Sequence, residues 1–145
     1  MKHPPIELRV GDCQEIEAFL ADRIYEFNSK VTGYFDGESF SLIQRNNLGA
    51  ILAGISGYTW GGCCFISHLW VAEAQRRQGL GRALLQGAED NARSKGCAVV
   101  LVSSHSFQAP WFYKRLGYEK RATVADHPQG HSNIFYAKRL VPDAA

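Results

Sequence analysis

Arginine and glycine crowd the stretch AQRRQGLGRALLQGAEDNARSKG, which otherwise has the pattern of a helix. Gly79 and Gly81 each cost roughly 1 kcal/mol relative to alanine inside a helix. The first turn of a helix carries free backbone N–H groups and the positive end of the helix dipole. Two or three hydrogen bonds to an anion, worth roughly 1.5–3 kcal/mol each, would offset that cost. The stretch therefore predicts an anion site, to which Arg76, Arg77 and Arg82 add positive charge.

The spacing of the glycines excludes two common phosphate-binding motifs. A P-loop needs Gly-Lys-Ser/Thr, which this sequence lacks. The dinucleotide-binding fingerprint G-x-G-x-x-G needs a third glycine where this chain has Leu84. That fingerprint also lies closer to the start of a chain than residues 79–84 do here. The pattern that remains is R-x-x-G-x-G over residues 76–81.

Length and composition indicate a single globular domain over residues 1–145. The chain is 46% hydrophobic and 21% charged, and it is long enough to bury a core. A net charge of +2 is too small to favour nucleic acid or an anionic membrane as a partner. The four cysteines form no C-x-x-C pair, so we expect neither a zinc site nor a disulfide framework. With no apolar leader or membrane-spanning run, we expect a reduced, cytoplasmic protein.

Hydrophobic periodicity predicts the elements that position these residues. Asp12 and Glu15 have the spacing of a capping box at the start of the first helix. The nearly continuous apolar run CCFISHLWV is typical of a strand buried on both faces. The helix after the glycines presents an apolar stripe formed by Leu80, Ala83, Leu84, Ala88 and Ala92.

The order of the predicted elements favours an α/β fold with one mixed sheet. A strand–helix–strand unit lies in the middle of the chain, with hairpins before and after it, so we expect helices on the faces of the sheet. The predicted helices cover 13–28, 79–95 and a short segment with Pro110 in its first turn. The predicted strands cover 6–10, 40–44, 50–58, 63–71, 97–103, 118–124 and 133–140.

Further motifs flank R-x-x-G-x-G on both sides. Upstream lies SHLWVAEAQ, and downstream lie AVVLVSS and APWFYKRLGYE. In this order the segments closely resemble the GNAT superfamily of N-acetyltransferases, whose acetyl-CoA motif is R-x-x-G-x-G and whose later signature is A-x-x-F-Y-x-K-x-G-F. The resemblance covers about residues 40–118 strongly and the rest by pattern only. It implies a GNAT-like mixed sheet with a splayed, bulged strand and helices on both faces.

The resemblance implies acetyl-CoA as the co-substrate. The backbone of Leu69 and Val71 would pair with its pantetheine arm as an added strand, since a splayed strand exposes unpaired N–H and C=O groups. An N–H near Val71 is the natural oxyanion donor. Many members have an asparagine where this chain has Ser106, which we expect to cap the next helix and to make a weaker cofactor contact. Beside Arg76 and Arg77, the pyrophosphate would be held by the N–H groups of Gln78, Gly79, Leu80, Gly81 and Arg82.

Tyr113 matches the family tyrosine that donates to the leaving sulfur. A phenol has a pKa near ~10 and an alkyl thiol near ~8.5, so complete proton transfer in water would be uphill by roughly 2 kcal/mol. We therefore expect a strong hydrogen bond with late or incomplete transfer, and a packing role is the alternative. His68 is the candidate base, with a water relay or a structural histidine as alternatives, and His105 is a lesser candidate.

The sequence favours an acetyl-CoA-dependent N-acetyltransferase that acts on a primary amine of a small molecule by direct attack on the thioester. A protein or peptide acetyltransferase and a non-catalytic acyl-CoA sensor are the alternatives. Asp126, His127 and His131 lie in a region that borders the acceptor pocket in the family, although a surface turn is the simpler interpretation. Their spacing across Gly130 does not suit a metal, and we expect none. The family favours a homodimer.

Overall fold

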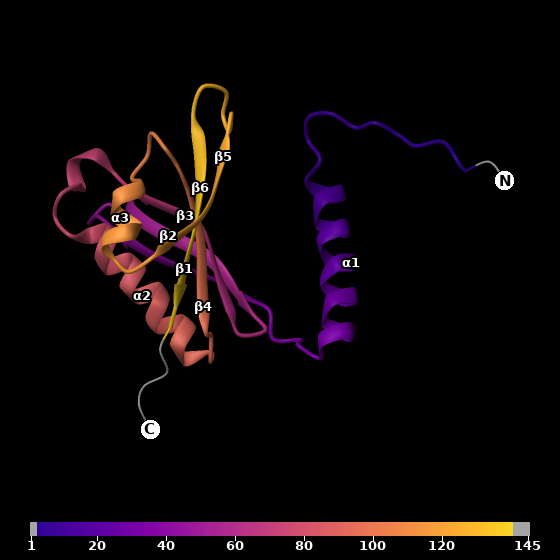
Figure 1. The fold of residues 1–145 in the computed structure, drawn as a ribbon, viewed down its shortest axis with the longest axis horizontal. Coiled ribbons are helices and arrows are strands. Elements are labelled where there is room, and N and C mark those ends of the chain that lie inside the picture. Colours follow the sequence, from indigo (N-terminus) through magenta and orange to yellow (C-terminus); the bar gives the residue numbers. More distant parts are fainter. Residues whose placement is uncertain (1–2, 141–145) are drawn as a thin grey trace. The chain divides into compact units, whose positions relative to one another are not determined.

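The structure is a computed structural model that describes residues 3–140, and Figure 1 shows the order of its elements. The chain divides into two compact units, one ending at Phe35 and one beginning at Asp36. The first unit contains one helix, α1 (Gln14–Thr32). This helix ends at Gly33, which adopts the left-handed conformation with φ of 81° and donates its N–H to the Ser29 carbonyl.

The first unit corrects two sequence-based expectations. Residues 6–10 form no strand, because no described segment pairs with their backbone N–H and C=O groups. The N-cap of α1 is Cys13 rather than Asp12. The Asp12 carboxylate instead accepts a hydrogen bond from the N–H of Gln14 at 3.3 Å. Glu15 lies in the first turn, where its charge complements the helix dipole.

The second unit is built on a six-stranded mixed sheet with the order β1-β2-β3-β4-β6-β5. Every neighbouring pair is antiparallel except β3 and β4, which are parallel and are connected through α2. The mixed α/β fold expected from the sequence is therefore confirmed. The elements are β1 (Glu38–Arg45), β2 (Ile51–Trp60), β3 (Cys63–Val71), η1 (Glu73–Gln75), α2 (Leu80–Ser94), β4 (Val99–His105), α3 (Pro110–Arg115), β5 (Glu119–Ala125) and β6 (Ser132–Arg139).

Within this second unit, α2 and α3 pack on the same face of the sheet (Figure 1). Within this unit, burial alternates along β2 with the period of two that is typical of a strand covered on one face. On β3, Ile66 is buried whereas Trp70 is 52% exposed. Within the second unit by itself, β3 is therefore buried on one face, whereas the sequence predicts burial on both.

The buried face of α2 is rotated from the predicted stripe. Ala83, expected inside, is exposed, whereas Leu85 is fully buried. Glu89 also lies on this face and is only 2% exposed. The helix therefore places a carboxylate in the core, next to the apolar residues that the periodicity identified.

A β-bulge interrupts β3 at Ser67. On neighbouring β2, Ser56 pairs with His68 but Gly57 pairs with Ile66, so Ser67 is the extra residue. Ile66 before the bulge and Leu69 after it therefore lie on the same face of the sheet, although they are three residues apart and not two. The bulge increases local twist at the point where β3 begins to diverge from β4.

Beyond the bulge, β3 and β4 separate. Their parallel pairing covers only residues 63–65 of β3 and 99–101 of β4. In the described structure, residues 66–71 and 102–105 of these strands do not pair with each other. The splayed, bulged strand implied by the sequence resemblance is present, and it leaves two strand edges open inside the sheet.

Candidate active site

The loop before α2 presents a run of free backbone donors. Arg77 and Gly79 adopt left-handed conformations with φ of 66° and 77°, and Gly79 is the N-cap of α2. Among the described residues, the N–H groups of residues 78–82 donate to no protein acceptor. Successive N–H groups around left-handed residues form a concave anion-binding nest, here at the positive end of a helix dipole. Free N–H groups arranged in this way can bind an anion.

The two glycines of this loop differ in what a side chain would meet at each position. At Gly79 the positive φ favours glycine, and a Cβ there would meet no atom within 4 Å. Gly81 is helical, and a Cβ there would face the Phe112 ring at 3.5 Å and Val71 at 3.9 Å, which is ordinary contact. At Gly79, a side chain would be disfavoured by the backbone conformation and would also extend into the open space from which a ligand could approach the backbone. A side chain at Gly81 would point toward α3, and the role of this glycine at a ligand stays a prediction.

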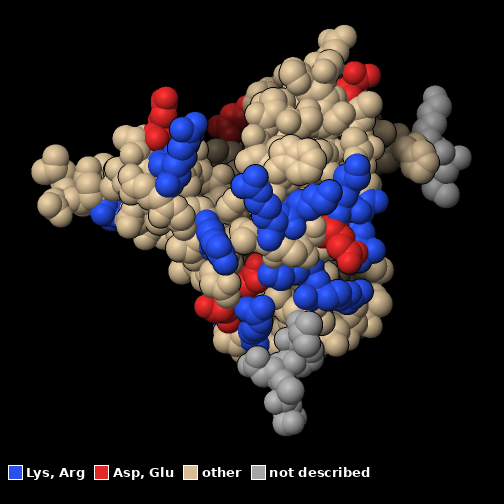
Figure 2. All heavy atoms as spheres, turned by 60° about the vertical axis from the view of Figure 1, so that its left-hand side comes forward, with Lys and Arg blue, Asp and Glu red and all other residues tan. Residues whose placement is uncertain are grey.

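Cationic side chains surround the loop, and Figure 2 shows Lys and Arg gathered on the face formed by α2 and α3. The Nε of Arg76 donates to the Val71 carbonyl at 3.0 Å, which ties the loop to the end of β3. Arg82 and Arg115 line a hollow of about 360 Å³ beside α2. Neither guanidinium pairs with a carboxylate in the described part of the chain, so both retain their charge for an anion.

Leu69 and Val71 direct their backbone groups toward the open side of β3. The N–H of Ala72 donates to the Leu52 carbonyl at 2.8 Å, and antiparallel pairing alternates along a strand. The N–H and C=O groups of Leu69 and Val71 therefore point away from β2. The Val71 carbonyl is bonded to Arg76. The groups of Leu69 and the N–H of Val71 face the space from which β4 has diverged.

Tyr113 of α3 lies on the sheet face that α2 covers and is 7% exposed. Its ring packs against Tyr136 and Tyr118, with centroid distances of 5.7 Å and 5.8 Å. Burial, with a smaller contribution from Tyr136, raises the pKa of Tyr113 to about 12. The phenol is therefore protonated at neutral pH. Within the described residues its hydroxyl donates no hydrogen bond, so its proton is available to a bound group.

His68 lies on the face of the sheet opposite Tyr113. It follows the bulge and pairs with Ser56, whose Oγ lies 3.4 Å from the imidazole Nδ1. Ser56 alternates along β2 with buried Ile55, so Ser56 and His68 both point away from α2. The structure thus positions the two candidate catalytic residues on opposite faces of the sheet, with His68 on the part of β3 that has separated from β4.

Ser106 lies in the loop after β4 and does not begin a helix. The N-cap of α3 is Ala109, and Pro110 occupies the first turn, where its missing N–H is tolerated. Ser106 instead pairs with Ser132, donating its N–H to the Ser132 carbonyl at 2.8 Å. Its Oγ accepts from the Ser132 N–H at 3.1 Å. The expected capping role is wrong, because this residue extends the strand pairing.

The turn between β5 and β6 contacts the end of β4 through four rings. The rings of His105 and Phe107 are parallel with centroids 5.3 Å apart. His127 meets His105 edge-on at 5.2 Å, and His131 meets Phe107 at 5.0 Å. The Nδ1 of His105 also lies 2.9 Å from the His127 carbonyl, so this nitrogen carries a proton. Sequence reasoning missed Phe107, since spacing along the chain does not show ring contacts between distant loops.

Metal ligands and reactive thiols do not gather at this site. Among residues 3–140, no three His, Cys, Asp or Glu side chains are placed to hold a metal ion. All four cysteines are free. Burial, with smaller contributions from Cys97, Cys63 and Glu89, raises the pKa of Cys64 to about 12, which keeps this thiol neutral. None of the helices between residues 3 and 140 has the length and apolar character needed to cross a membrane.

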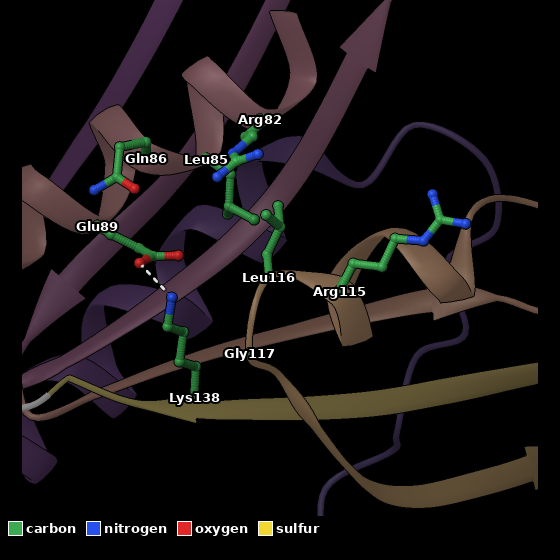
Figure 3. A pocket seen from close by; sticks show the side chains of 8 residues that line it. All are labelled: Arg82, Leu85, Gln86, Glu89, Arg115, Leu116, Gly117 and Lys138. Carbon is green, nitrogen blue, oxygen red and sulfur yellow. Dashed lines mark hydrogen bonds and ion pairs between the residues drawn. The ribbon is translucent and has the colours of Figure 1, made fainter. Parts of the chain in front are cut away.

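Sequence reasoning also missed the role of Glu89 in the core. Its carboxylate accepts a hydrogen bond from the Tyr118 hydroxyl at 2.9 Å and from the Lys138 ammonium at 2.8 Å. Figure 3 shows the Glu89–Lys138 pair at the hollow that Arg82 also lines. The signal lay in the spacing, because Glu89 follows Leu85 by four residues and so shares its helix face.

Comparison with known proteins finds relatives over most of the chain. The model of the acetyltransferase (GNAT) family matches residues 9–118. Blasticidin-S acetyltransferase of Streptomyces morookaense is 36% identical over 104 residues, which cover 71% of this chain and 76% of that protein. An acetyltransferase of Agrobacterium fabrum is 29% identical over 126 residues, which cover 87% of this chain and 92% of that protein. A crystal structure of an acetyltransferase from Bacillus cereus has a TM-score of 0.78 and 36% identity, and the match covers 93% of this chain and 98% of that one.

Proposed function

The chain belongs to the GNAT acetyltransferase family, and from this premise we propose that it transfers the acetyl group of acetyl-CoA to a primary amine of a small molecule. The observation that carries the proposal is the open edge of β3 at Leu69 and Val71, which leads to the free N–H groups of residues 78–82. An amide-bearing arm with a phosphate at one end suits such an edge, because strand addition satisfies the amides and the loop satisfies the phosphate.

The donor-binding residues fit acetyl-CoA in chemistry as well as in position. The N–H groups of residues 78–82, with the guanidinium of Arg82, would hold the pyrophosphate. The C=O of Leu69 and one of the N–H groups of Leu69 and Val71 would pair with the pantetheine amides, which leaves the second N–H for the thioester carbonyl. Because the Val71 carbonyl is bonded to Arg76, that carbonyl takes no part unless the arginine moves. Acetyl-CoA supplies the activated thioester when it is bound.

The acetyl-transfer step needs an oxyanion donor, a proton acceptor and a donor to the leaving sulfur. A backbone N–H of the open edge of β3 would bind the carbonyl oxygen as negative charge develops there. His68, directly or through a water, would take a proton from the ammonium, so that the neutral amine can attack the thioester carbonyl as the C–S bond breaks. Tyr113 would donate its free hydroxyl proton in a hydrogen bond to the sulfur. The pKa of Tyr113 is about 12, and that of an alkyl thiol is near ~8.5, so complete proton transfer from the phenol to the sulfur would be uphill by roughly 5 kcal/mol. We therefore expect the proton to stay on the Tyr113 hydroxyl.

A small-molecule acceptor is supported by the relative named blasticidin-S acetyltransferase, whose name states a small-molecule acceptor. His68 faces the side of the sheet opposite α2, so we infer that the amine approaches from that side. A peptide acceptor would need the same reactive groups, and the acceptor panel below separates the two cases.

Calorimetric titration with acetyl-CoA, followed by a thiol-release assay, tests the proposal. We expect one site per chain and release of CoA thiol with at least one member of a panel of small amines and antibiotics. A parallel panel of lysine-bearing and free N-terminal peptides should give no release above the rate without acceptor. Tight binding with no release across both panels would favour an acyl-CoA sensor, and absence of binding would overturn the phosphate interpretation of the loop.

A further inference from the structure

Glu89 is a buried carboxylate for which the proposed chemistry has no use. It lies on the inner face of α2 and is 2% exposed. One oxygen accepts from the Lys138 ammonium at 2.8 Å, and the other accepts from the Tyr118 hydroxyl at 2.9 Å. Arg93 approaches the carboxylate at 3.7 Å from the next turn of the helix. The charge is thus compensated by groups from α2, β6 and the segment that follows α3, and Figure 3 shows the pairing with Lys138 of β6.

Stability alone is a weak reason for this arrangement. Removing a carboxylate and an ammonium from water costs several kcal/mol, and well-packed apolar residues of similar size often stabilise a fold as much or more. What a fully satisfied buried network adds is a defined geometry, since each hydrogen bond holds its partners in one orientation. The partner whose orientation matters here is Tyr118.

Tyr118 connects this network to Tyr113. The two rings meet edge-on with centroids 5.8 Å apart. The N–H of Tyr118 also donates to the Tyr113 carbonyl at 3.1 Å, so the backbones are joined as well. Lys138 reaches over the Tyr118 ring, with its ammonium 5.5 Å from the ring centroid. Burial and the neighbouring Glu89 charge raise the pKa of Tyr118, which keeps its hydroxyl a donor to Glu89.

The other face of Tyr113 is held in a similar way. Tyr136 packs against it at 5.7 Å, and the Tyr136 hydroxyl donates to the carbonyl of Pro110 at 3.0 Å. Pro110 is the first residue of α3, the helix that carries Tyr113. The Tyr113 ring therefore packs against two tyrosines whose own hydroxyls are fixed by hydrogen bonds, whereas among the described residues its own hydroxyl has no partner.

We propose that Glu89 is a positioning residue for acetyl transfer: through its hydrogen bond with Tyr118, it holds the Tyr113 ring so that the free hydroxyl meets the leaving sulfur. This inference rests on the proposed role of Tyr113. Glu89 touches neither the acetyl donor nor the amine. Its effect is on the fraction of time that the phenol occupies the productive orientation, and so on kcat rather than on acetyl-CoA binding.

A double-mutant cycle between Tyr118 and Tyr113 tests the inference. Tyr118→Phe removes only the hydroxyl and leaves Glu89 paired with Lys138, so we expect the chain to fold. We expect kcat to fall roughly tenfold, as a small misplacement of a catalytic group does, with the KM for acetyl-CoA unchanged. When Tyr113 is already phenylalanine, adding Tyr118→Phe should change kcat no further, because there is no hydroxyl left to position.

Glu89→Gln provides a second variant. Its matched control is Glu119→Gln on exposed β5, where the Glu119 carboxylate lies 3.3 Å from the Arg121 guanidinium. Glu89→Gln should lower kcat in the same manner as Tyr118→Phe, and Glu119→Gln should leave it unchanged. An equal loss of kcat from Tyr118→Phe with and without the Tyr113 hydroxyl would overturn the inference, as would a lower Tm with kcat intact. If Tyr113→Phe alone left kcat unchanged, the proposed role of Tyr113 would fail first. If the wild type released no thiol, the proposed function would fail.

Discussion

The Tyr113 ring lies 5.7 Å from the ring of Tyr136, and the Tyr136 hydroxyl donates to the carbonyl that begins the helix of Tyr113. Tyr136 thus packs against the ring of Tyr113 and is also bonded to the start of the helix that carries it. This packing also accounts for the raised pKa of Tyr113, because the rings that surround the phenol exclude water from it.

Tyr113→Phe is expected to lower kcat by roughly a hundredfold, the lower end of the usual contribution of a positioned proton donor. The KM for acetyl-CoA should change little, since the hydroxyl acts on the sulfur only as charge develops there. Steady-state thiol release with a productive amine measures both constants. Tyr58→Phe, on a ring 46% exposed on β2, is the matched control. A loss confined to KM would show that the phenol binds the donor rather than assists departure of the thiolate.

The two glycines of the phosphate loop should respond differently to alanine. Gly79→Ala forces a side chain into a left-handed conformation and should destabilise the fold by about 1 kcal/mol. It should also weaken acetyl-CoA binding by disturbing the adjacent N–H groups. Gly81→Ala places a Cβ in ordinary contact with Phe112, so stability should be retained or rise slightly, and binding should persist. Thermal melts and calorimetry measure the two effects. Loss of binding in Gly81→Ala with an intact fold would show that the ligand approaches this position closely.

His68→Gln is expected to reduce kcat/KM roughly tenfold or more, because glutamine retains polarity but cannot take the proton of the ammonium. His3→Gln, at an exposed position near the N-terminus, is the control for the loss of an imidazole. His105→Gln separates the two candidate bases. If His105→Gln lowered kcat/KM and His68→Gln did not, His105 at the end of β4 would be the base. Equal activity in all three variants would favour a water relay.

Stability should decline at alkaline pH through the buried phenol. The pKa of Tyr113 is raised to about 12 in the folded protein, so the folded state binds this proton more tightly than the unfolded chain does. Its contribution is fully present below pH ~10 and is lost as pH rises from about 10 to about 12, at most about 3 kcal/mol. Denaturant melts across this range measure the loss. Tyr113→Phe should show a shallower decline, and an identical decline would mean that other groups carry it, Tyr118 first among them.

Local patterns in the sequence identify much of this molecule. The apolar run of β3 begins and ends as predicted, and the helix after Gly79 follows from its periodicity, its glycine N-cap and Gly96 at its end. These features are decided by residues that are neighbours along the chain, through backbone conformation and amphipathic spacing. The family could be identified for the same reason, since its motifs are short segments in a fixed order.

Contacts between distant segments are decided only by the tertiary structure. Glu89 and Tyr118 are 29 positions apart, and Glu89 and Lys138 are 49 apart, so no local spacing relates them. The misassigned role of Ser106 has the same origin, because its partner Ser132 belongs to β6. The sequence by itself determined the family motifs and so the residues to which we propose to assign the chemistry. Tertiary packing decided which face each one occupies, how deeply Tyr113 is buried and what holds it there, because those depend on distances between strands and helices that meet only in the folded chain.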